Sequence, residues 1–130
     1  MTLPWDLEDW LTEVGGQVVE KQAALGDTSL SKQDQLILAI WLLDTEARNG
    51  GLSQYFANHG VEQWEKCVAL ASSDAIPSFA PFAEAVTAML SGNPDPYLAL
   101  IARDAEANDL YHTYQFSLVS ELRQSVVTDR

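Results

Sequence analysis

Hydrophobic residues recur along most of this chain at the spacing of an α-helix. After Pro4, the first segment carries a series of apolar residues that would share one helical face: Leu7, Trp10, Leu11, Val14, Val18 and Leu25. The run from Leu36 to Leu43 is apolar nearly all round, which predicts a central and deeply buried helix. No segment shows the alternating pattern of a β-strand.

Polar residues and glycines predict where the next helices begin and end. Ser31 and Asp34 have the spacing of a capping box, with aspartate in place of the usual glutamate, directly before the apolar run. The sequence Asn49-Gly50-Gly51 ends this helix, because asparagine and glycine readily adopt the left-handed conformation beyond a helix end. There follow a short helix over 52–58, a break at His59-Gly60 and a helix over 61–72.

Prolines mark the helices of the C-terminal half. Pro77 and Ser78 precede a helix that accepts Pro81 only in its first turn, and Gly92-Asn93-Pro94 ends it. Asp95-Pro96 is typical of an N-cap followed by the first helical position, and predicts a last helix over 97–126. Its expected core positions are Ile101, Leu110, Tyr111, Tyr114, Leu118 and Leu122. We therefore predict an all-α fold in which residues 1–130 form a single compact domain of five or six helices.

The chain is strongly acidic. Among its 130 residues, 19 Asp and Glu oppose 7 Lys and Arg, which gives a formal net charge of −12 at pH 7. The acidic residues are spread over the whole chain and do not form a tail, so the charge belongs to the folded body. Direct binding to nucleic acid or to an anionic membrane surface is disfavoured, because both depend on basic residues that face phosphate groups.

The sequence shows no signal for secretion or for membrane insertion. Its acidic N-terminal segment lacks the basic region of a signal peptide, and the longest apolar run stops at Asp44, short of the roughly 20 residues that span a bilayer. The only cysteine, Cys67, cannot form an intramolecular disulfide, and its apolar neighbours predict a small buried hydrophobic residue. We expect a soluble, cytoplasmic protein.

The sequence carries no recognisable catalytic or metal-binding pattern. His59 and His112 lie outside any His-Glu-x-x-His motif or close Cys/His cluster. A pair formed by Cys67 and His59 would span a helix break, and Gly50-Gly51 lacks the rest of a phosphate-binding loop. Carboxylates are abundant, but most are expected on solvated helix faces. We therefore predict no catalytic residue, no cofactor and no metal.

The least generic segment runs from Glu46 to Asn58. An Asn-Gly-Gly corner is followed at once by two aromatic residues among amides, which predicts a turn packed inward, with the amides bonded to backbone groups at the helix junction. The alternative is a ligand groove lined by Asn49, Gln54 and Asn58, which an enzyme would use as its site. The segment resembles the signature of the DNA-mimic-protein family through Glu46, Asn49, Gly50, Gly51, Gln54, Tyr55, Phe56 and Asn58.

The resemblance covers about residues 30–90. It departs from the family pattern at Leu52, where the family usually has phenylalanine. The resemblance implies an acidic, all-helical, non-enzymatic protein that forms a homodimer. It also implies that surface carboxylates imitate DNA phosphates and occupy the DNA-binding face of a transcription factor. The shared motif is expected to form the corner of the fold and not the mimicking surface.

Acidic residues of the first predicted helix form one stripe. At about 100° per residue, Asp6, Asp9, Glu13 and Glu20 fall within about 60° of one another, beside the apolar face. Duplex DNA carries one charge per roughly 1.7 Å, so one stripe is several-fold too sparse, whereas a dimer of charge −24, twice −12, matches about 12 base pairs. Gly15-Gly16 predicts a kink or a close helix contact within the stripe. The other candidate partner-binding carboxylates are Glu62, Glu65, Asp104 and Asp109.

These features leave two main hypotheses of function. The first is an acidic protein that binds the basic face of a DNA-binding protein and competes with DNA, and a continuous acidic ridge would favour it. The second is an adaptor or immunity-type protein that recognises one partner through an apolar patch, and an exposed Trp5 or Trp64 would favour it. A simpler reading of the charge is that the acidic residues only keep a small protein soluble.

Overall fold

The computed structural model of the protein describes residues 4–72 and 76–128. These residues contain helices and no strand, which confirms the predicted all-α fold. The elements are α1 (Trp5–Leu25), the short 3-10 helix η1 (Asp27–Ser29), α2 (Lys32–Ala71), α3 (Phe79–Leu90), α4 (Pro96–Ile101) and α5 (Asp104–Thr128).

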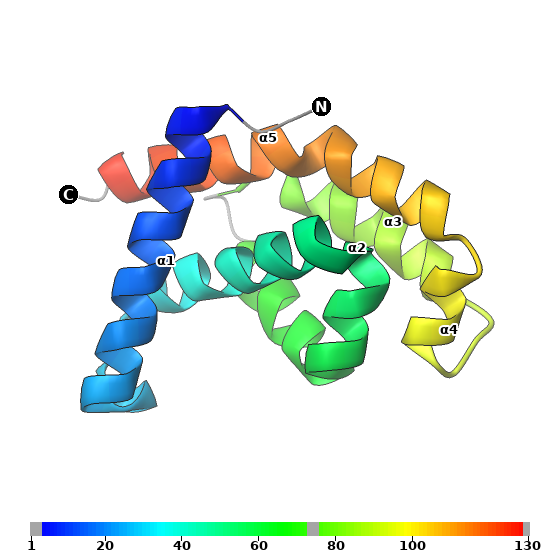
Figure 1. Cartoon of the computed structure of the whole chain (residues 1–130), viewed down its shortest axis with the longest axis horizontal. Helices are drawn as coiled ribbons and strands as arrows, with labels where there is room; N and C mark the ends of the chain where they lie inside the picture. Colours follow the sequence, from blue (N-terminus) through cyan, green and yellow to red (C-terminus); the bar gives the residue numbers. More distant parts are fainter. Residues whose placement is uncertain (1–3, 73–75, 129–130) are drawn as a thin grey trace.

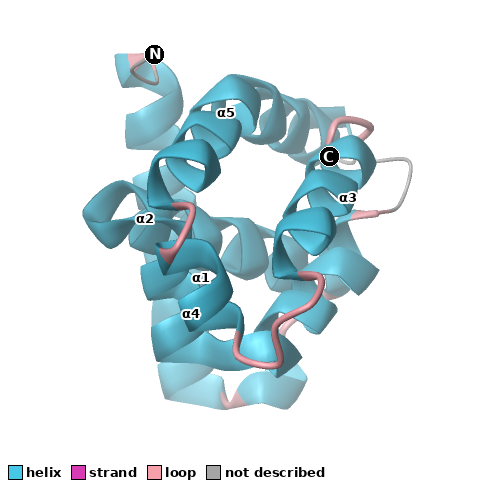
Figure 2. Cartoon of the chain, turned by 90° about the vertical axis from the view of Figure 1, so that its right-hand side faces the viewer, coloured by secondary structure: helices cyan, strands magenta, loops and turns pink. Residues whose placement is uncertain are grey.

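Helices α2 and α5 organise the arrangement, because each of them contacts all the other α-helices. Helix α1 crosses one end of the molecule and α4 lies at the opposite end, with α5 running between them (Figure 1). The view from the α4 end shows the loops that join α3 to α4 and α4 to α5 (Figure 2). Helices that are distant in the sequence pack against each other, as α1 does against α5.

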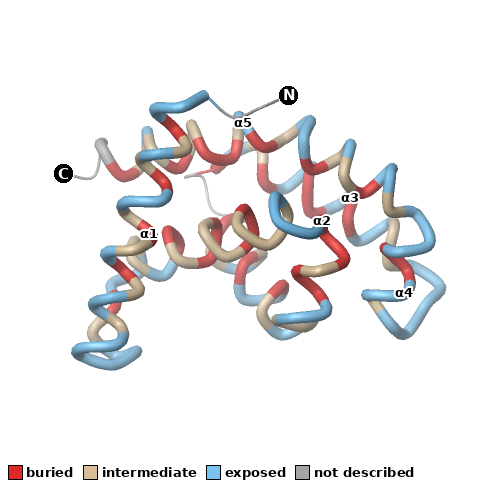
Figure 3. Tube along the Cα trace, viewed as in Figure 1, coloured by how far each residue is buried: buried red, intermediate tan, exposed pale blue. Residues whose placement is uncertain are grey.

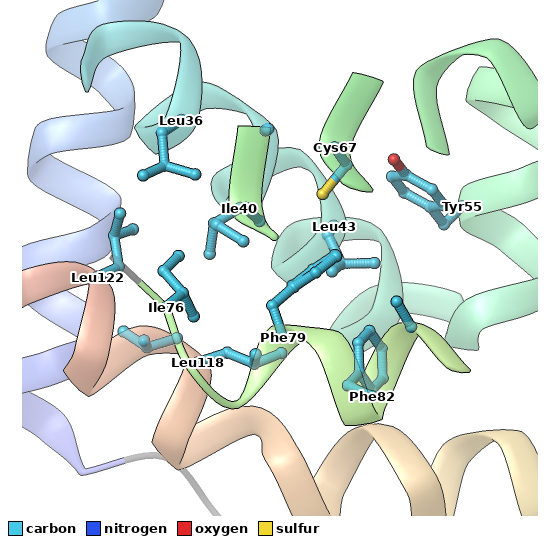
Figure 4. Close-up of a cluster of buried hydrophobic side chains, with 14 of the residues drawn as sticks. Leu36, Ile40, Leu43, Tyr55, Cys67, Ile76, Phe79, Phe82, Leu118 and Leu122 are labelled. Carbon is cyan, nitrogen blue, oxygen red and sulfur yellow. The ribbon is translucent and has the colours of Figure 1, made fainter. Parts of the chain in front are cut away.

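Most of the core lies between α2, α3 and α5, and α1 and α4 add buried residues at its edges. Buried positions recur along the inner sides of the helices (Figure 3). In the close-up, Ile40 and Leu43 of α2 point toward Phe79 of α3 and Leu118 of α5 (Figure 4). The stretch from Leu36 to Leu43 contributes five buried residues, which confirms the predicted central helix: Leu36, Ile37, Ala39, Ile40 and Leu43.

The predicted helix caps are present. The backbone N–H of Asp34 donates to Oγ of Ser31 (3.0 Å), and the backbone N–H of Ser31 donates to Oδ2 of Asp34 (3.2 Å). Lys21 of α1 also donates to Oδ2 of Asp34 (2.8 Å). Burial alone would raise the pKa of Asp34, but the hydrogen bonds from Lys21 and Ser31 outweigh it and lower that pKa. At α4, Asp95 is the N-cap and Pro96 the first helical residue.

The predicted last helix over 97–126 is wrong, because the chain turns at residues 102 and 103. Helix α4 ends at Ile101 and α5 begins at Asp104. Ile101, expected in the core, is therefore exposed at the end of α4. No glycine or proline marks this turn, and only Asp104 and Glu106 in the first turn of α5 favour a new helix start through the helix dipole.

Helix α1 runs through Gly15 and Gly16 without a break. Gly15 permits a close approach to α2, since a Cβ atom there would lie 2.2 Å from Cδ1 of Trp41. Of the two expectations for these glycines, the close helix contact is the one observed. Leu25, the last member of the predicted apolar series, is exposed because α1 ends there and the chain turns at Gly26.

Cys67 is fully buried, as its neighbours predict. Burial raises the pKa of its thiol to about 12, so the thiol stays protonated and unreactive at pH 8. We expect Cys67 to resist iodoacetamide at pH 8 in the folded protein and to react readily once the protein is unfolded in urea. Mass spectrometry of the modified fraction tests this, and rapid labelling of the folded protein would contradict it.

Candidate partner-binding surface

The Asn-Gly-Gly corner is a sharp break inside α2. Gly50 and Gly51 have non-helical backbone angles (φ −150°, ψ 15° and φ 85°, ψ 173°), and Gly60 forms a second break (φ 78°, ψ 178°). Helix α2 therefore consists of three helical stretches, which confirms the breaks predicted at Asn49-Gly50-Gly51 and at His59-Gly60. The chain visibly changes direction at these breaks (Figure 1).

The aromatic residues of the corner point inward. Tyr55 and Phe56 are buried, and the ring of Phe56 lies 5.6 Å from that of Trp64, centroid to centroid. Trp64 in turn lies 5.8 Å from Phe79 of α3. Such edge and tilted ring contacts stabilise a fold beyond the area that they bury. The motif thus joins two stretches of α2 to α3.

The polar residues of the corner stabilise the same turn. Nδ2 of Asn58 donates to Oε2 of Glu46 across the corner, and Nε2 of His59 lies 3.9 Å from that oxygen. Gln54 covers Gly50 so closely that a Cβ atom on the glycine would lie 1.8 Å from its Oε1. Asn49 is exposed. These contacts support the structural interpretation of the motif, but Asn58 donates to a carboxylate and not to a backbone group as predicted.

Replacement of Gly51 by alanine is expected to cost about 1–3 kcal/mol of unfolding free energy. Its φ of 85° is unfavourable for residues with a Cβ atom, and that atom would lie 2.6 Å from Oδ1 of Asn108. Gly16→Ala is the matched control, because Gly16 lies within α1 with no atom near its Cβ position. Urea denaturation should show Gly16→Ala neutral or stabilising, and equal effects of the two changes would contradict this account.

The predicted acidic stripe of α1 faces solvent. Asp6, Asp9, Glu13 and Glu20 are all exposed. Asp6 forms an ion pair with Arg123 of α5 (3.2 Å), and this cation compensates part of the negative charge of Asp6. The other three have no ion-pair partner among the described residues. We call Asp9, Glu13 and Glu20 the α1 acidic face.

The remaining candidate carboxylates lie elsewhere on the molecule. Glu62 and Glu65 are exposed on the last stretch of α2. Asp109 is exposed near the start of α5, whereas Asp104 is half-buried and accepts a hydrogen bond from Asn108 (3.4 Å). The start of α5 lies at the end of the molecule opposite α1 (Figure 1). The carboxylates of α1 and those near the start of α5 therefore lie at opposite ends of the molecule.

A buried polar network joins α1, α2 and α5, and the sequence analysis missed it. Asp44 is fully buried and accepts hydrogen bonds from the hydroxyl of Tyr111, Nε2 of Gln115 (2.9 Å) and Nε of Arg48 (2.7 Å). Arg48 also pairs with Glu8 of α1 (2.9 Å). Burial, and then the charge of Asp44, hold the pKa of Tyr111 well above its ordinary value.

Two of the apolar residues that bear on the adaptor hypothesis differ in their surroundings. Trp64 is buried in the aromatic cluster, whereas Trp5 is 83% exposed at the start of α1. A second exposed apolar group lies on α4 and comprises Tyr97, Leu98 and Ile101. Of these two tryptophans, only Trp5 is exposed to a partner.

Within residues 4–72 and 76–128, no group of three or more His, Cys, Asp or Glu side chains is arranged to hold a metal ion. None of the helices in this part of the chain is long and apolar enough to cross a membrane.

Together, the helical fold, the glycine corner and the exposed carboxylates define an acidic all-α protein. A family model described as DMP19-like protein matches residues 28–122. The chain therefore belongs to the DMP19-like family of DNA-mimic proteins. The match begins near η1 and extends into α5, well past the segment of about 30–90 that the motif indicated, and α1 lies outside it. Comparisons with curated proteins and with solved structures found no match.

Proposed function

We propose that this protein binds the DNA-binding face of a transcription factor or another DNA-binding protein and competes there with DNA. The observation that carries the proposal is the set of exposed, unpaired carboxylates on a member of a DNA-mimic family. Such carboxylates can occupy the positions of phosphates against a basic surface, because both are fixed negative charges with oxygen acceptors. In this role the protein regulates transcription without catalysing a reaction, and it acts in the cytoplasm.

The spacing of the charges favours a surface built from more than one helix. Asp9, Glu13 and Glu20 are about 6 Å and 10.5 Å apart along α1, whereas one DNA strand has a phosphate every 3.4 Å or so. A homodimer would bring two copies of each acidic group to one partner. Its charge of −24, twice −12, corresponds to about 12 base pairs. We therefore propose that the dimer is the binding species.

The adaptor function is the second candidate, and the exposed indole of Trp5 favours it. An adaptor would bind mainly through apolar contacts, whose strength changes little with salt. A DNA mimic depends on charge, and its binding weakens as salt screens the attraction. The response to salt therefore separates the two functions.

A pull-down from the lysate of the source cell at low salt tests the proposal. We expect the immobilised protein to retain one DNA-binding protein, which rising NaCl releases and which its own duplex DNA also displaces. A partner without a DNA-binding role that stays bound at high salt would instead establish the adaptor function.

A further inference from the structure

A groove of about 450 Å³ has no residue of the α1 acidic face in its lining. One wall is formed by the end of α1 and by η1, the floor by the first stretch of α2, and the other wall by the last stretch of α2. Its floor is apolar, with the half-buried side chains of Leu38, Trp41 and Leu42. The edge of the Trp41 indole packs against Gly15, which holds the ring in place. The volume is in the range of about 300–1,000 Å³ that is typical of binding sites.

The wall beside α1 offers hydrogen-bond acceptors. Nε2 of Gln22 donates to Oδ1 of Asp27 (2.6 Å), and Nε2 of Gln35 donates to the carbonyl oxygen of Leu30 (3.2 Å). These bonds direct the NH₂ group of each amide toward the protein, so the amide oxygen is the end left for a ligand. With the carboxylate of Asp27, this wall is complementary to a cationic donor such as guanidinium or ammonium.

We propose that this groove binds an amphipathic basic helix of a partner protein. The apolar face of that helix would cover Leu38, Trp41 and Leu42, and an Arg or Lys beside that face would bind the Asp27 wall. The net charge of −12 attracts such a helix at long range. None of the candidate carboxylates of the proposed function lines the groove, so the inference stands whether or not the protein competes with DNA.

The opposite wall supplies a test of the charge argument. Lys66 lines the groove and forms no ion pair with the described residues, so it opposes a cationic ligand. Lys66→Glu should therefore tighten binding by about fivefold or more, and Asp27→Asn should weaken it by about fivefold. Lys32→Glu and Glu84→Gln make the same charge changes at exposed residues outside the groove lining and outside the α1 acidic face, and each should change the Kd less than about twofold.

The probe is a synthetic helical peptide of leucine and lysine with one apolar face, and the full chain is titrated with it. A peptide of the same composition with its leucines scattered around the helix is the control. Fluorescence anisotropy gives the Kd, and the indole N–H signals of ¹⁵N-labelled protein locate the contact. We expect the patterned peptide to bind more tightly and to shift the signal of Trp41 while leaving that of Trp5, at the other end of α1, unchanged. Equal binding of both peptides, or an unmoved Trp41 signal, would overturn the proposal.

Discussion

Asp44→Ala is expected to lower the unfolding free energy by about 3–5 kcal/mol, which makes it one of the most damaging single changes in the chain. The carboxylate is fully buried and accepts hydrogen bonds from Tyr111, Gln115 and Arg48. Without it, the buried hydroxyl and amide lose their acceptor, and each unsatisfied donor costs about 1–3 kcal/mol. Arg48 keeps its ion pair with Glu8 and its contact with solvent, so the loss of its hydrogen bond to Asp44 costs less free energy.

Tyr111→Phe is the matched milder change for this network. It removes only the hydroxyl and leaves the ring in its contact with Phe82, at 6.0 Å between centroids. The expected cost is about 1.5–3 kcal/mol, as for a hydrogen bond to a charged group. Urea denaturation of both variants gives the comparison. If Asp44→Ala were no worse than Tyr111→Phe, the network would not be what joins α2 to α5.

Neutralising the α1 acidic face is expected to weaken binding to the DNA-binding partner by about tenfold or more at low salt. The variant carries Asp9→Asn, Glu13→Gln and Glu20→Gln, and each exposed charge pair contributes about 0.2–1 kcal/mol. Its affinity should also fall less steeply with salt, because fewer charges are screened. These side chains are exposed and unpaired in the described structure, so the unfolding free energy should change little.

The control compares the effects on affinity of two single substitutions of exposed glutamates, one outside and one inside the α1 acidic face. Glu84 lies on α3, outside every group of candidate carboxylates, and Glu13 lies within the α1 acidic face. Glu84→Gln should leave the affinity unchanged, whereas Glu13→Gln should lower it. If the triple variant bound as tightly as the unmodified protein, partner binding would belong to the groups on α2 and α5, which lie within the family match.

The sequence predicts those elements of the fold whose ends carry local signals. Ser31, Asp95 and the glycines at 50, 51 and 60 act through nearby backbone groups, so the caps and breaks are evident from the sequence. The turn between α4 and α5 carries no glycine or proline, and only the acidic residues Asp104 and Glu106 follow it. It depends on packing between distant helices, which leaves Ile101 exposed where helical spacing alone places it in the core.

The candidate site is less predictable because it depends on tertiary arrangement. Helical spacing correctly places Asp9, Glu13 and Glu20 on the solvent side of α1. It does not reveal that the start of α5 lies at the other end of the molecule (Figure 1), nor that Arg123 pairs with Asp6. The sequence does contain two features that indicate the Asp44 network. An acidic residue interrupts an apolar helix, and Tyr111 and Gln115 are one turn apart on α5.

Competition with DNA on the purified partner is the most direct test of the central claim. The fluorescently labelled operator duplex of that partner is bound first, and increasing amounts of this protein are then added while anisotropy is followed. The proposed function predicts complete displacement of the duplex, with a midpoint that rises with NaCl and rises further for the variant neutralised at Asp9, Glu13 and Glu20. Formation of a ternary complex, in which the partner binds DNA and this protein together, would contradict it.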